Sequence, residues 1–301
     1  MDAWNISRER INVDEHSAIV AVGGDGTLHE VINGMMNRED KKKLPIAFIP
    51  NGSGNDLVSC FGIDSVLTAL DYLRKGDTVK MDLNKVLIDA DSEADVPVAD
   101  RFEKLRYSVI NASIGFIAKT VHKAASAKSW AGKHAYVYSG VSEFLGGCRP
   151  DTYSVQIEQP DGTSQTNENL ESVIIFINNG KFCGGGLLIT PTALLNDGLL
   201  DIAIRHGGLG TRDCASILTS LIKYEGAHAY RDDFEIMRAS TITFTNKNYM
   251  RNASVATSPN YMKKQPQMLQ VDGEPMMFSE KVKIEVLPEA IDVIVNFDRM
   301  M

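Results

Sequence analysis

The sequence predicts an N-terminal α/β domain with a parallel sheet, followed by a larger β-sandwich-like domain with helical insertions. Up to about residue 82, apolar runs of strand length alternate with segments of helical periodicity. Beyond that point, short apolar runs follow one another between turn residues, as in a sandwich or barrel. We therefore expect an α/β domain at residues 1–82 and a β-rich domain at 83–301, with a site in the cleft between them.

The α/β part begins with Ala18–Val22, an apolar run typical of a strand that is covered on both faces. Apolar residues then recur at helical spacing from Leu28 to Met36, and a second buried strand is predicted at Ile46–Ile49. A second helix is predicted over Ser65–Arg74. The order strand, helix, strand, helix predicts parallel strands with helices on their faces.

Short strands dominate the β-rich part. They are predicted at Lys85–Ile88, Tyr107–Asn111, Tyr153–Glu158, Ser172–Asn178, Leu199–Ile204, Ser240–Thr245, Met268–Val271 and Val282–Val286. A last apolar run, Glu289–Phe297, is a candidate to close the sandwich. Helical insertions are predicted at Ile117–Leu145 and Cys214–Glu225, and surface loops at Asp89–Arg101 and Asn246–Gln267.

Composition argues against several classes of function. The 31 basic and 39 acidic residues give a formal net charge of −8 at pH 7, whereas nucleic-acid binders present a basic face to phosphates. The four cysteines lack the paired spacing of a zinc site or a disulfide framework. The N-terminus does not read as a signal peptide, and every apolar run is shorter than the about 20 residues that span a bilayer. We therefore expect a cytoplasmic protein.

The strongest local signal is the loop Gly23-Gly24-Asp25-Gly26-Thr27, which lies between a buried strand and a helix. Glycines allow tight turns and close backbone approach, so consecutive N–H groups can face an anion. The positive end of the helix dipole adds to this preference. The loop matches neither the dinucleotide fingerprint nor a Walker motif. A phosphate site and a purely structural turn capped by Thr27 both remain open.

A second loop, Asn51-Gly52-Ser53-Gly54-Asn55-Asp56, also follows a predicted strand. By itself it is equally compatible with a capped turn. Loops that follow successive parallel strands meet at one end of the sheet, where α/β folds bind ligands. The pair therefore indicates a phosphate-binding site more specifically than either loop does alone.

Two acidic turns and a glycine run complete the candidate motifs. Asp272-Gly273-Glu274 is either a hairpin turn or a carboxylate pair facing the glycine loop across the cleft. Asp197 begins a similar Asp-Gly turn, and its carboxylate together with nearby carbonyls is suited to Mg²⁺. Gly184–Gly186 predicts either a second element passing very close or a hinge. The six histidines have no metal spacing, and His29 stands out only because it follows the first loop.

Taken in this order and spacing, these motifs resemble the diacylglycerol kinase catalytic-domain family, which includes bacterial lipid kinases, sphingosine kinases and ceramide kinases. The resemblance covers about residues 15–297. Gly-Gly-Asp-Gly-Thr alone also occurs in NAD kinases and phosphofructokinases, but the full ordered set does not. The resemblance implies an ATP-dependent kinase that phosphorylates a lipid hydroxyl.

The resemblance also implies ATP and Mg²⁺ as cofactors and assigns roles to residues. The nucleotide would be bound by Gly23, Gly24, Asp25, Gly26, Thr27, Glu30, Asn51, Gly52 and Ser53. Mg²⁺ would be oriented, or the proton of the lipid hydroxyl accepted, by the carboxylates of Asp25, Asp272 and Glu274. A structural Mg²⁺ site would consist of the Leu194 and Leu199 carbonyls and the Asp197 carboxylate.

Two departures from the family pattern matter. Family members carry a strand and a further small-residue loop well before the glycine loop, whereas only 22 residues precede Gly23, so the α/β domain is expected to lack its first strand. The stretch Ser113–Lys119 is similar to sphingosine kinases, with Lys119 where an aspartate would meet the sphingosine amine. A cation there would repel an ammonium group, so we expect diacylglycerol as substrate.

The same segment interleaves basic and aromatic residues, which predicts either a solvated helix face or a helix that contacts the membrane. Its basic residues are Lys123, Lys128, Lys133 and His134, and its aromatic residues are Trp130 and Tyr136. A lipid presented by a membrane surface is therefore the expected partner, with transient peripheral association and a homodimer as a further possibility. Three alternatives stay open: a sphingoid-base kinase, an NAD kinase, and a catalytically silent lipid- or nucleotide-binding module.

Overall fold

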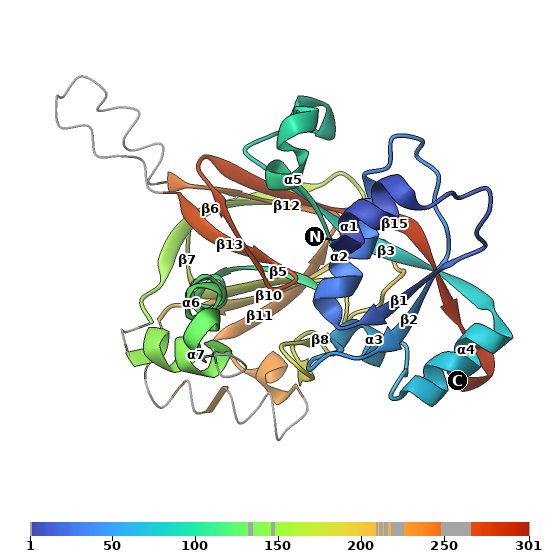
Figure 1. Ribbon diagram of the computed structural model, residues 1–301. Helices are drawn as coiled ribbons and strands as arrows, with labels where there is room; N and C mark the ends of the chain where they lie inside the picture. Colours follow the sequence, from blue (N-terminus) through green and yellow to red (C-terminus); the bar gives the residue numbers. More distant parts are fainter. Residues whose placement is uncertain are drawn as a thin grey trace.

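The N-terminal part of the fold is built on two parallel strands. The computed structural model describes residues 2–131, 135–145, 148–208, 210, 213, 216–217, 226–247 and 266–300. Strand β1 (Ile19–Gly23) pairs with β2 (Ile46–Pro50). Helix α2 (Asp25–Met36) connects them and buries most of the apolar stripe that the sequence predicts. The predicted strand–helix–strand order is confirmed (Figure 1).

The other N-terminal helices are short. They are α1 (Asp2–Asn5), the π-helical turn η1 (Ile6–Arg10), α3 (Asp56–Cys60) and α4 (Val66–Lys75). Helix α4 begins after Ser65, whose hydroxyl accepts a hydrogen bond from the Thr68 N–H, and it ends at Gly76 in the left-handed conformation. These two caps explain why the sequence located this helix to within a residue.

The β-rich part contains all the predicted strands. Its strands are β3 (Asp77–Ile88), β4 (Leu105–Ser108), β5 (Asn111–Gly115), β6 (Asp151–Glu158), β7 (Ser164–Asn178), β8 (Phe182–Cys183), β9 (Leu187–Leu188), β10 (Leu200–His206), β11 (Phe234–Ala239), β12 (Thr241–Thr245), β13 (Gln267–Val271), β14 (Glu274–Phe278) and β15 (Lys281–Val295). The predicted strand Tyr107–Asn111 is divided into β4 and β5 by a turn. Strands β8, β9, β11 and β14 were not anticipated.

Strands β3 and β15 join the two parts. Their antiparallel pairing extends from Val282 of β15, which pairs with Ile88 of β3, to Val295, which pairs with Asp77. Val293 of β15 also pairs in parallel with Ile46 of β2. The predicted run Glu289–Phe297 therefore extends the N-terminal sheet and does not close the sandwich. The domain boundary expected at residue 82 falls inside β3, so one hydrogen-bonded sheet continues through both parts.

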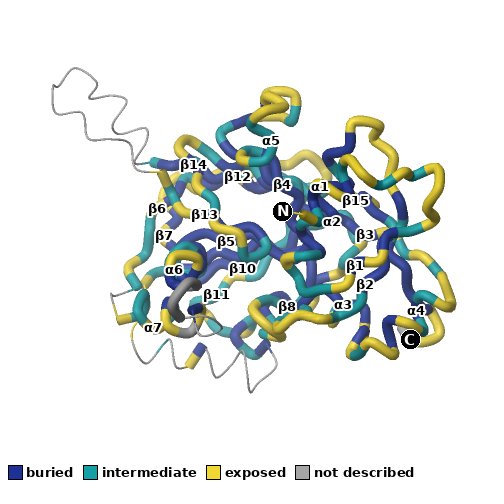
Figure 2. Tube along the Cα trace, in the orientation of Figure 1, coloured by how far each residue is buried: buried dark blue, intermediate teal, exposed yellow. Residues whose placement is uncertain are grey.

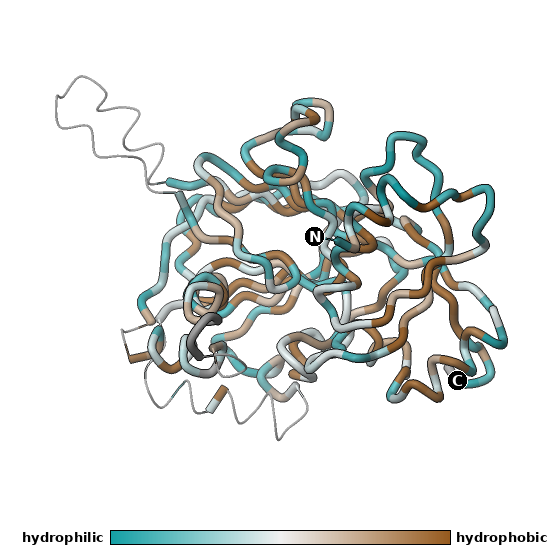
Figure 3. The backbone as a smooth tube through the Cα atoms, in the orientation of Figure 1, coloured by the Kyte–Doolittle hydropathy of each residue, from teal (hydrophilic) through white to brown (hydrophobic). Residues whose placement is uncertain are grey.

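Two main apolar cores lie on either side of this junction. The first includes Ile32, Phe48 and Val293, and the second includes Ile177, Phe244 and Ile284, all nearly or fully buried. Figure 2 shows the buried strands in the middle of each part, and Figure 3 shows that the same strands are hydrophobic. The C-terminal strand contributes to both cores, so neither part packs independently of the other.

Helices and turns cover this sheet. The first helical insertion is confirmed as α6 (Phe116–Ala131) and α7 (Ala135–Leu145). The expected loop Asp89–Arg101 contains the 3₁₀ turns η2 (Glu93–Asp95) and η3 (Val98–Asp100) and leads into α5 (Arg101–Lys104). A further 3₁₀ turn is η5 (Ala227–Tyr230), and α10 (Phe297–Met300) ends the described chain. Most of the predicted elements Cys214–Glu225 and Asn246–Gln267 lies outside the described residues.

Candidate active site

The two glycine loops are in direct backbone contact at the carboxyl ends of β1 and β2. The Asn51 N–H donates to the Gly23 carbonyl at 2.9 Å. A Cβ atom at Gly24 would lie 2.9 Å from the Gly52 Cα, and one at Gly52 would lie 2.4 Å from the Gly24 Cα. Both glycines are therefore required for this approach. The predicted meeting of the loops is confirmed, with Asn51, Gly52 and Ser53 exposed at its rim.

Asp25 links the first loop to the helix that follows the second. Its carboxylate accepts hydrogen bonds from the Asp56 N–H at 3.2 Å and the Leu57 N–H at 3.4 Å, at the start of α3. Burial raises the pKa of Asp25, and the charge of Asp56 adds to this effect, while the backbone donors oppose it. Asp25 thus has a structural role between the loops as well as its predicted place in the nucleotide site.

Asp56 extends this network to the glycine run. Its buried carboxylate accepts hydrogen bonds from the Gly185 and Gly186 N–H groups, at 3.0 and 2.6 Å. Gly184, Gly185 and Gly186 all have positive φ, a conformation that favours glycine. The close element that this run predicted is the second loop, since a Cβ at Gly54 would lie 3.7 Å from the Gly185 Cα. Sequence reasoning gave Asp56 no such role, although its place at a helix start was visible.

Asp272 is a buried structural carboxylate. It lies in the β13–β14 hairpin turn with Gly273, and both residues have positive φ. Its side chain accepts five hydrogen bonds, all between 2.8 and 2.9 Å: from His29 Nδ1, the Ser108 hydroxyl and the N–H groups of Val109, Ile110 and Asn111. Burial alone would raise its pKa, but the bond to His29 and the backbone donors outweigh it, so the pKa is lowered.

This environment changes the role expected for the Asp272/Glu274 pair. With its side chain fully buried and both oxygens engaged, Asp272 has no accessible lone pair for a substrate proton or a cation. It instead ties the hairpin to the turn between β4 and β5 and to α2. Glu274, at the start of β14, is exposed and lines a cavity between the two parts of the molecule.

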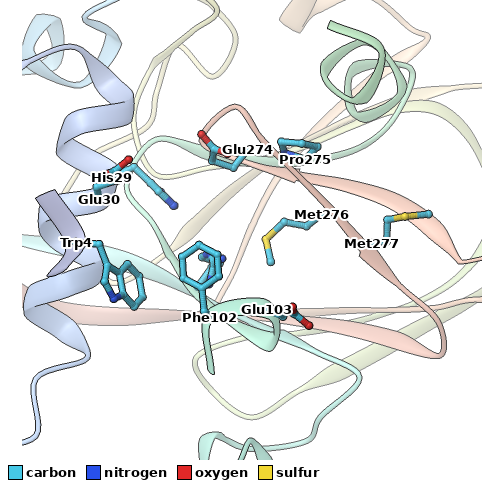
Figure 4. Close-up of a pocket in the computed structure, with 10 residues that line it drawn as sticks. Trp4, His29, Glu30, Phe102, Glu103, Glu274, Pro275, Met276 and Met277 are labelled. Atoms are coloured by element: carbon cyan, nitrogen blue, oxygen red, sulfur yellow. The ribbon is translucent and has the colours of Figure 1, made fainter. Parts of the chain in front are cut away.

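His29 is the residue that sequence reasoning left without a function. Its ring is nearly buried, and Nδ1 lies 2.8 Å from Asp272 Oδ2. Because the pKa of Asp272 is lowered, the carboxylate accepts and His29 Nδ1–H donates. The imidazole points into the cavity in Figure 4. Only the tertiary structure brings these two residues together, since they are 243 positions apart.

The cavity has a volume of about 370 Å³ and combines an apolar wall with charged groups. Its apolar lining comes from Trp4, Phe102, Pro275, Met276 and Met277. Its polar lining comes from His29, Glu30, Glu103, Arg106 and Glu274. Figure 4 shows Glu30, His29 and Glu274 at one end and the methionines further along. Glu30, predicted to contact the nucleotide, thus faces this cavity, and its carboxylate also accepts the Ala3 N–H at 3.2 Å.

The structural Mg²⁺ site expected at Leu194, Asp197 and Leu199 stays a prediction, and an arginine lies beside its carboxylate. One Asp197 oxygen accepts the Leu199 N–H at 3.2 Å, and the other lies 3.6 Å from the Arg238 guanidinium. Arg238 also binds the buried Asp201 at 3.1 Å and the Thr192 carbonyl. The guanidinium of Arg238 thus supplies a positive charge beside the segment Leu194–Leu199. Within the described residues, no three His, Cys, Asp or Glu side chains are grouped to hold a metal ion.

The predicted roles of two lysines are also corrected. Lys119 forms an ion pair with Asp151 at 2.7 Å and is not among the residues that line the cavity. Its charge is therefore no argument against an ammonium substrate. Lys123 binds Ser142 and Glu143 of α7 and does not present a free charge. Lys133 and His134 lie outside the described residues, as do the side chains of Lys128 and Trp130, so the rest of this segment stays a prediction.

The fold and the site define a class of protein: a two-part molecule with two contacting glycine loops at the ends of parallel strands and a cavity of mixed polarity beside α2. The family model of the diacylglycerol kinase catalytic domain matches residues 5–86. The model of the YegS C-terminal domain, described as NAD kinase β-sandwich-like, matches residues 110–295. The chain therefore belongs to the family of lipid kinases that combines these two domains.

Similar proteins agree with this assignment. "Probable lipid kinase YegS-like" of Shewanella frigidimarina is 28% identical, with 93% of this chain and 77% of that protein covered. "Lipid kinase YegS" of Escherichia coli K12 is 26% identical, with 91% and 77% covered. A crystal structure of a diacylglycerol kinase from Bacillus anthracis Sterne superposes with a TM-score of 0.61 at 18% identity, covering 99% of this chain and 82% of that one. The structural likeness supports the fold alone.

We predict that Gly52→Ala destabilises the protein, because the new methyl group would overlap the Gly24 backbone. The expected loss is about 2 kcal/mol in the free energy of unfolding, measured by urea denaturation. Gly26→Ala is the matched control, since a Cβ there meets nothing within 4 Å and the position is helical. Equal stability of the Gly52→Ala variant and the wild type would show that the loops separate readily.

A second prediction concerns pH. Burial, opposed by Arg238, raises the pKa of Asp201 to about 6. In the unfolded chain an aspartate titrates near pH 4, so the folded state binds the proton more tightly. The free energy of unfolding should therefore fall by about 2 kcal/mol, relative to Asp201→Asn, as pH rises from about 4 to about 6. Urea denaturation of both proteins across this window is the measurement, and parallel pH curves would contradict the prediction.

Proposed function

We propose that this chain transfers the γ-phosphoryl group of Mg·ATP to the free hydroxyl of diacylglycerol, with phosphatidic acid as the product. The supporting observation is the close contact of two small-residue loops at the ends of β1 and β2, one of which leads into α2. Exposed backbone there leaves room for phosphate oxygens, and the start of α2 favours negative charge. Phosphoryl transfer depends mainly on such positioning and charge compensation.

The cavity is the proposed site of the lipid acceptor. It lies beside α2, which carries Asp25 in its first turn and His29 and Glu30 in its second. Residues four apart on a helix are neighbours on one face, so His29 lies about 6 Å along the helix from Asp25. A hydroxyl near His29 would thus be close to a phosphate on the loop. Glu274 is the proposed acceptor of the hydroxyl proton, because Asp272 is fully engaged.

A sphingoid base is a second candidate substrate, favoured by one observation. Three carboxylates, Glu30, Glu103 and Glu274, line the cavity together with a single arginine. This excess of negative charge would attract an ammonium headgroup. The names of the relatives favour a lipid over NAD as the acceptor.

We propose that α7 contacts the membrane, in place of the basic residues that the sequence indicated between Lys123 and His134. Tyr138, Val141 and Leu145 lie on one side of this helix at spacings of three and four, and each is about half or more exposed. Such an apolar stripe suits the bilayer interface, from which a lipid substrate must come. No helix in the described part of the chain is long and apolar enough to cross a membrane.

The kinase proposal is tested by transfer of labelled phosphate from Mg·ATP to lipids in mixed micelles. We expect labelled phosphatidic acid from diacylglycerol, and a loss of at least about 100-fold with Asp25→Asn. Asp14→Asn is the control, because Asp14 is exposed and pairs with Lys42, outside both loops. Labelled product from sphingosine alone would favour the second candidate. Normal ATP binding without turnover on any lipid would establish a silent binding module.

The membrane proposal is tested with Leu145→Asp. We expect about tenfold weaker association with phospholipid vesicles in a flotation assay, because a buried leucine contributes about 1.5–3 kcal/mol. Leu67→Asp on α4 is the matched control, since both leucines are 78% exposed and the two helices lie far apart (Figure 1). Equal flotation of both variants and the wild type would exclude α7 as the contact.

A further inference from the structure

Arg106 is a buried cation in the wall of the cavity. It lies on β4 with only 5% of its surface exposed. Its guanidinium carbon is 3.9 Å from the centroid of the Phe102 ring and 5.7 Å from that of Trp4. Burial lowers its pKa to about 10, so the group remains charged at neutral pH. Stacking on two aromatic rings holds the guanidinium plane in one orientation.

Most of the hydrogen-bonding capacity of Arg106 is unused by the protein. A guanidinium has five N–H donors, and the described residues provide one acceptor, the Leu105 carbonyl at 3.1 Å from Nη1. Glu103 and Glu274 line the same cavity and act on Arg106 through their charge, but among the described residues no carboxylate forms an ion pair with it. No nitrogen of Arg106 is among the fully buried side-chain donors that lack a partner in the described residues, so its free N–H groups reach the cavity, where a ligand or water can bind them.

The surroundings limit what this ligand is. A phosphodiester at Arg106 would also meet the three carboxylates of the cavity, and an ammonium group, which those carboxylates would attract, cannot itself be the partner of the guanidinium. A neutral oxygen acceptor that is attached to apolar chains avoids both conflicts. Phe102 stacks on Arg106, and Met276 and Met277 line the same cavity. Figure 4 shows Phe102 between Trp4 and the two methionines, with His29 and Glu274 across from it.

We propose that Arg106 is a specificity residue that hydrogen-bonds the ester carbonyl oxygens of diacylglycerol. This inference rests on the proposed lipid kinase function, and it specifies which part of the substrate the protein recognises. The guanidinium fork presents parallel N–H groups to the two ester carbonyls, while the hydroxyl points towards His29 and Glu274. The first carbons of the acyl chains contact the two methionines. An acceptor lipid without ester carbonyls leaves Arg106 unsatisfied.

The test compares a diacylglycerol with the dialkylglycerol ether of equal chain length, which has the same hydroxyl and no carbonyl. For the wild type we expect kcat/KM to be about 10- to 100-fold higher for the diester, because a bound lipid without carbonyls would displace water from Arg106 and give its N–H groups no acceptor. Arg106→Met should lower the diester value most and bring the ratio of the two kcat/KM values close to one. Arg106→Lys, which keeps the charge but loses the fork, should also remove most of the preference.

Arg101→Met is the matched control, because Arg101 is a nearby arginine that pairs with Glu93 at the surface and does not line the cavity. It should keep the wild-type preference. Equal wild-type values for diester and ether would overturn the inference without any variant, and so would a preference that survives in Arg106→Met. Product from neither lipid would instead reject diacylglycerol as the acceptor, and the inference with it.

Discussion

The structure of the candidate site depends on the approach of two backbones at Gly24 and Gly52. No side chain larger than hydrogen fits between the loops, and the contact is maintained by carboxylates that cap neighbouring segments. Asp25 accepts hydrogen bonds from the start of α3, and Asp56 accepts them from the glycine run after β8. Three segments that are distant in the sequence are thereby held at one end of the parallel strands. This arrangement gives the proposed phosphate site a rigid backbone frame.

A third carboxylate, that of Asp272, fixes the elements around the cavity as Asp25 and Asp56 fix the loops. Asp272 joins the β13–β14 hairpin, the turn between β4 and β5, and α2 through five hydrogen bonds. The cavity lies against these same elements, so its shape follows from a buried ionised group. Strands β3 and β15 add to this rigidity because they run through both parts of the molecule. The two parts therefore form one structural unit around the cavity.

Some acidic residues are available for chemistry and others hold the structure together, and their sequence motifs do not distinguish the two groups. Asp272 and Glu274 are two positions apart, yet the first is fully engaged and the second lines the cavity. Asp197 resembles a metal ligand in sequence, yet Arg238 provides its counter-charge. Each carboxylate acquires its role from the donors that tertiary packing brings to it. A motif identifies which residues can act, and burial with hydrogen bonding decides which of them do.

The sequence by itself determined the fold class, most of the strands, the two glycine loops and the family, because these depend on local periodicity and on residues that turns require. Helix α4 was located closely because both of its caps are local. The course of β15, the His29–Asp272 pair, the role of Asp56 and the ion pairs of Lys119 and Arg238 were decided only by the tertiary structure. These features join residues far apart in the chain, and no local pattern specifies which distant donor meets which carboxylate.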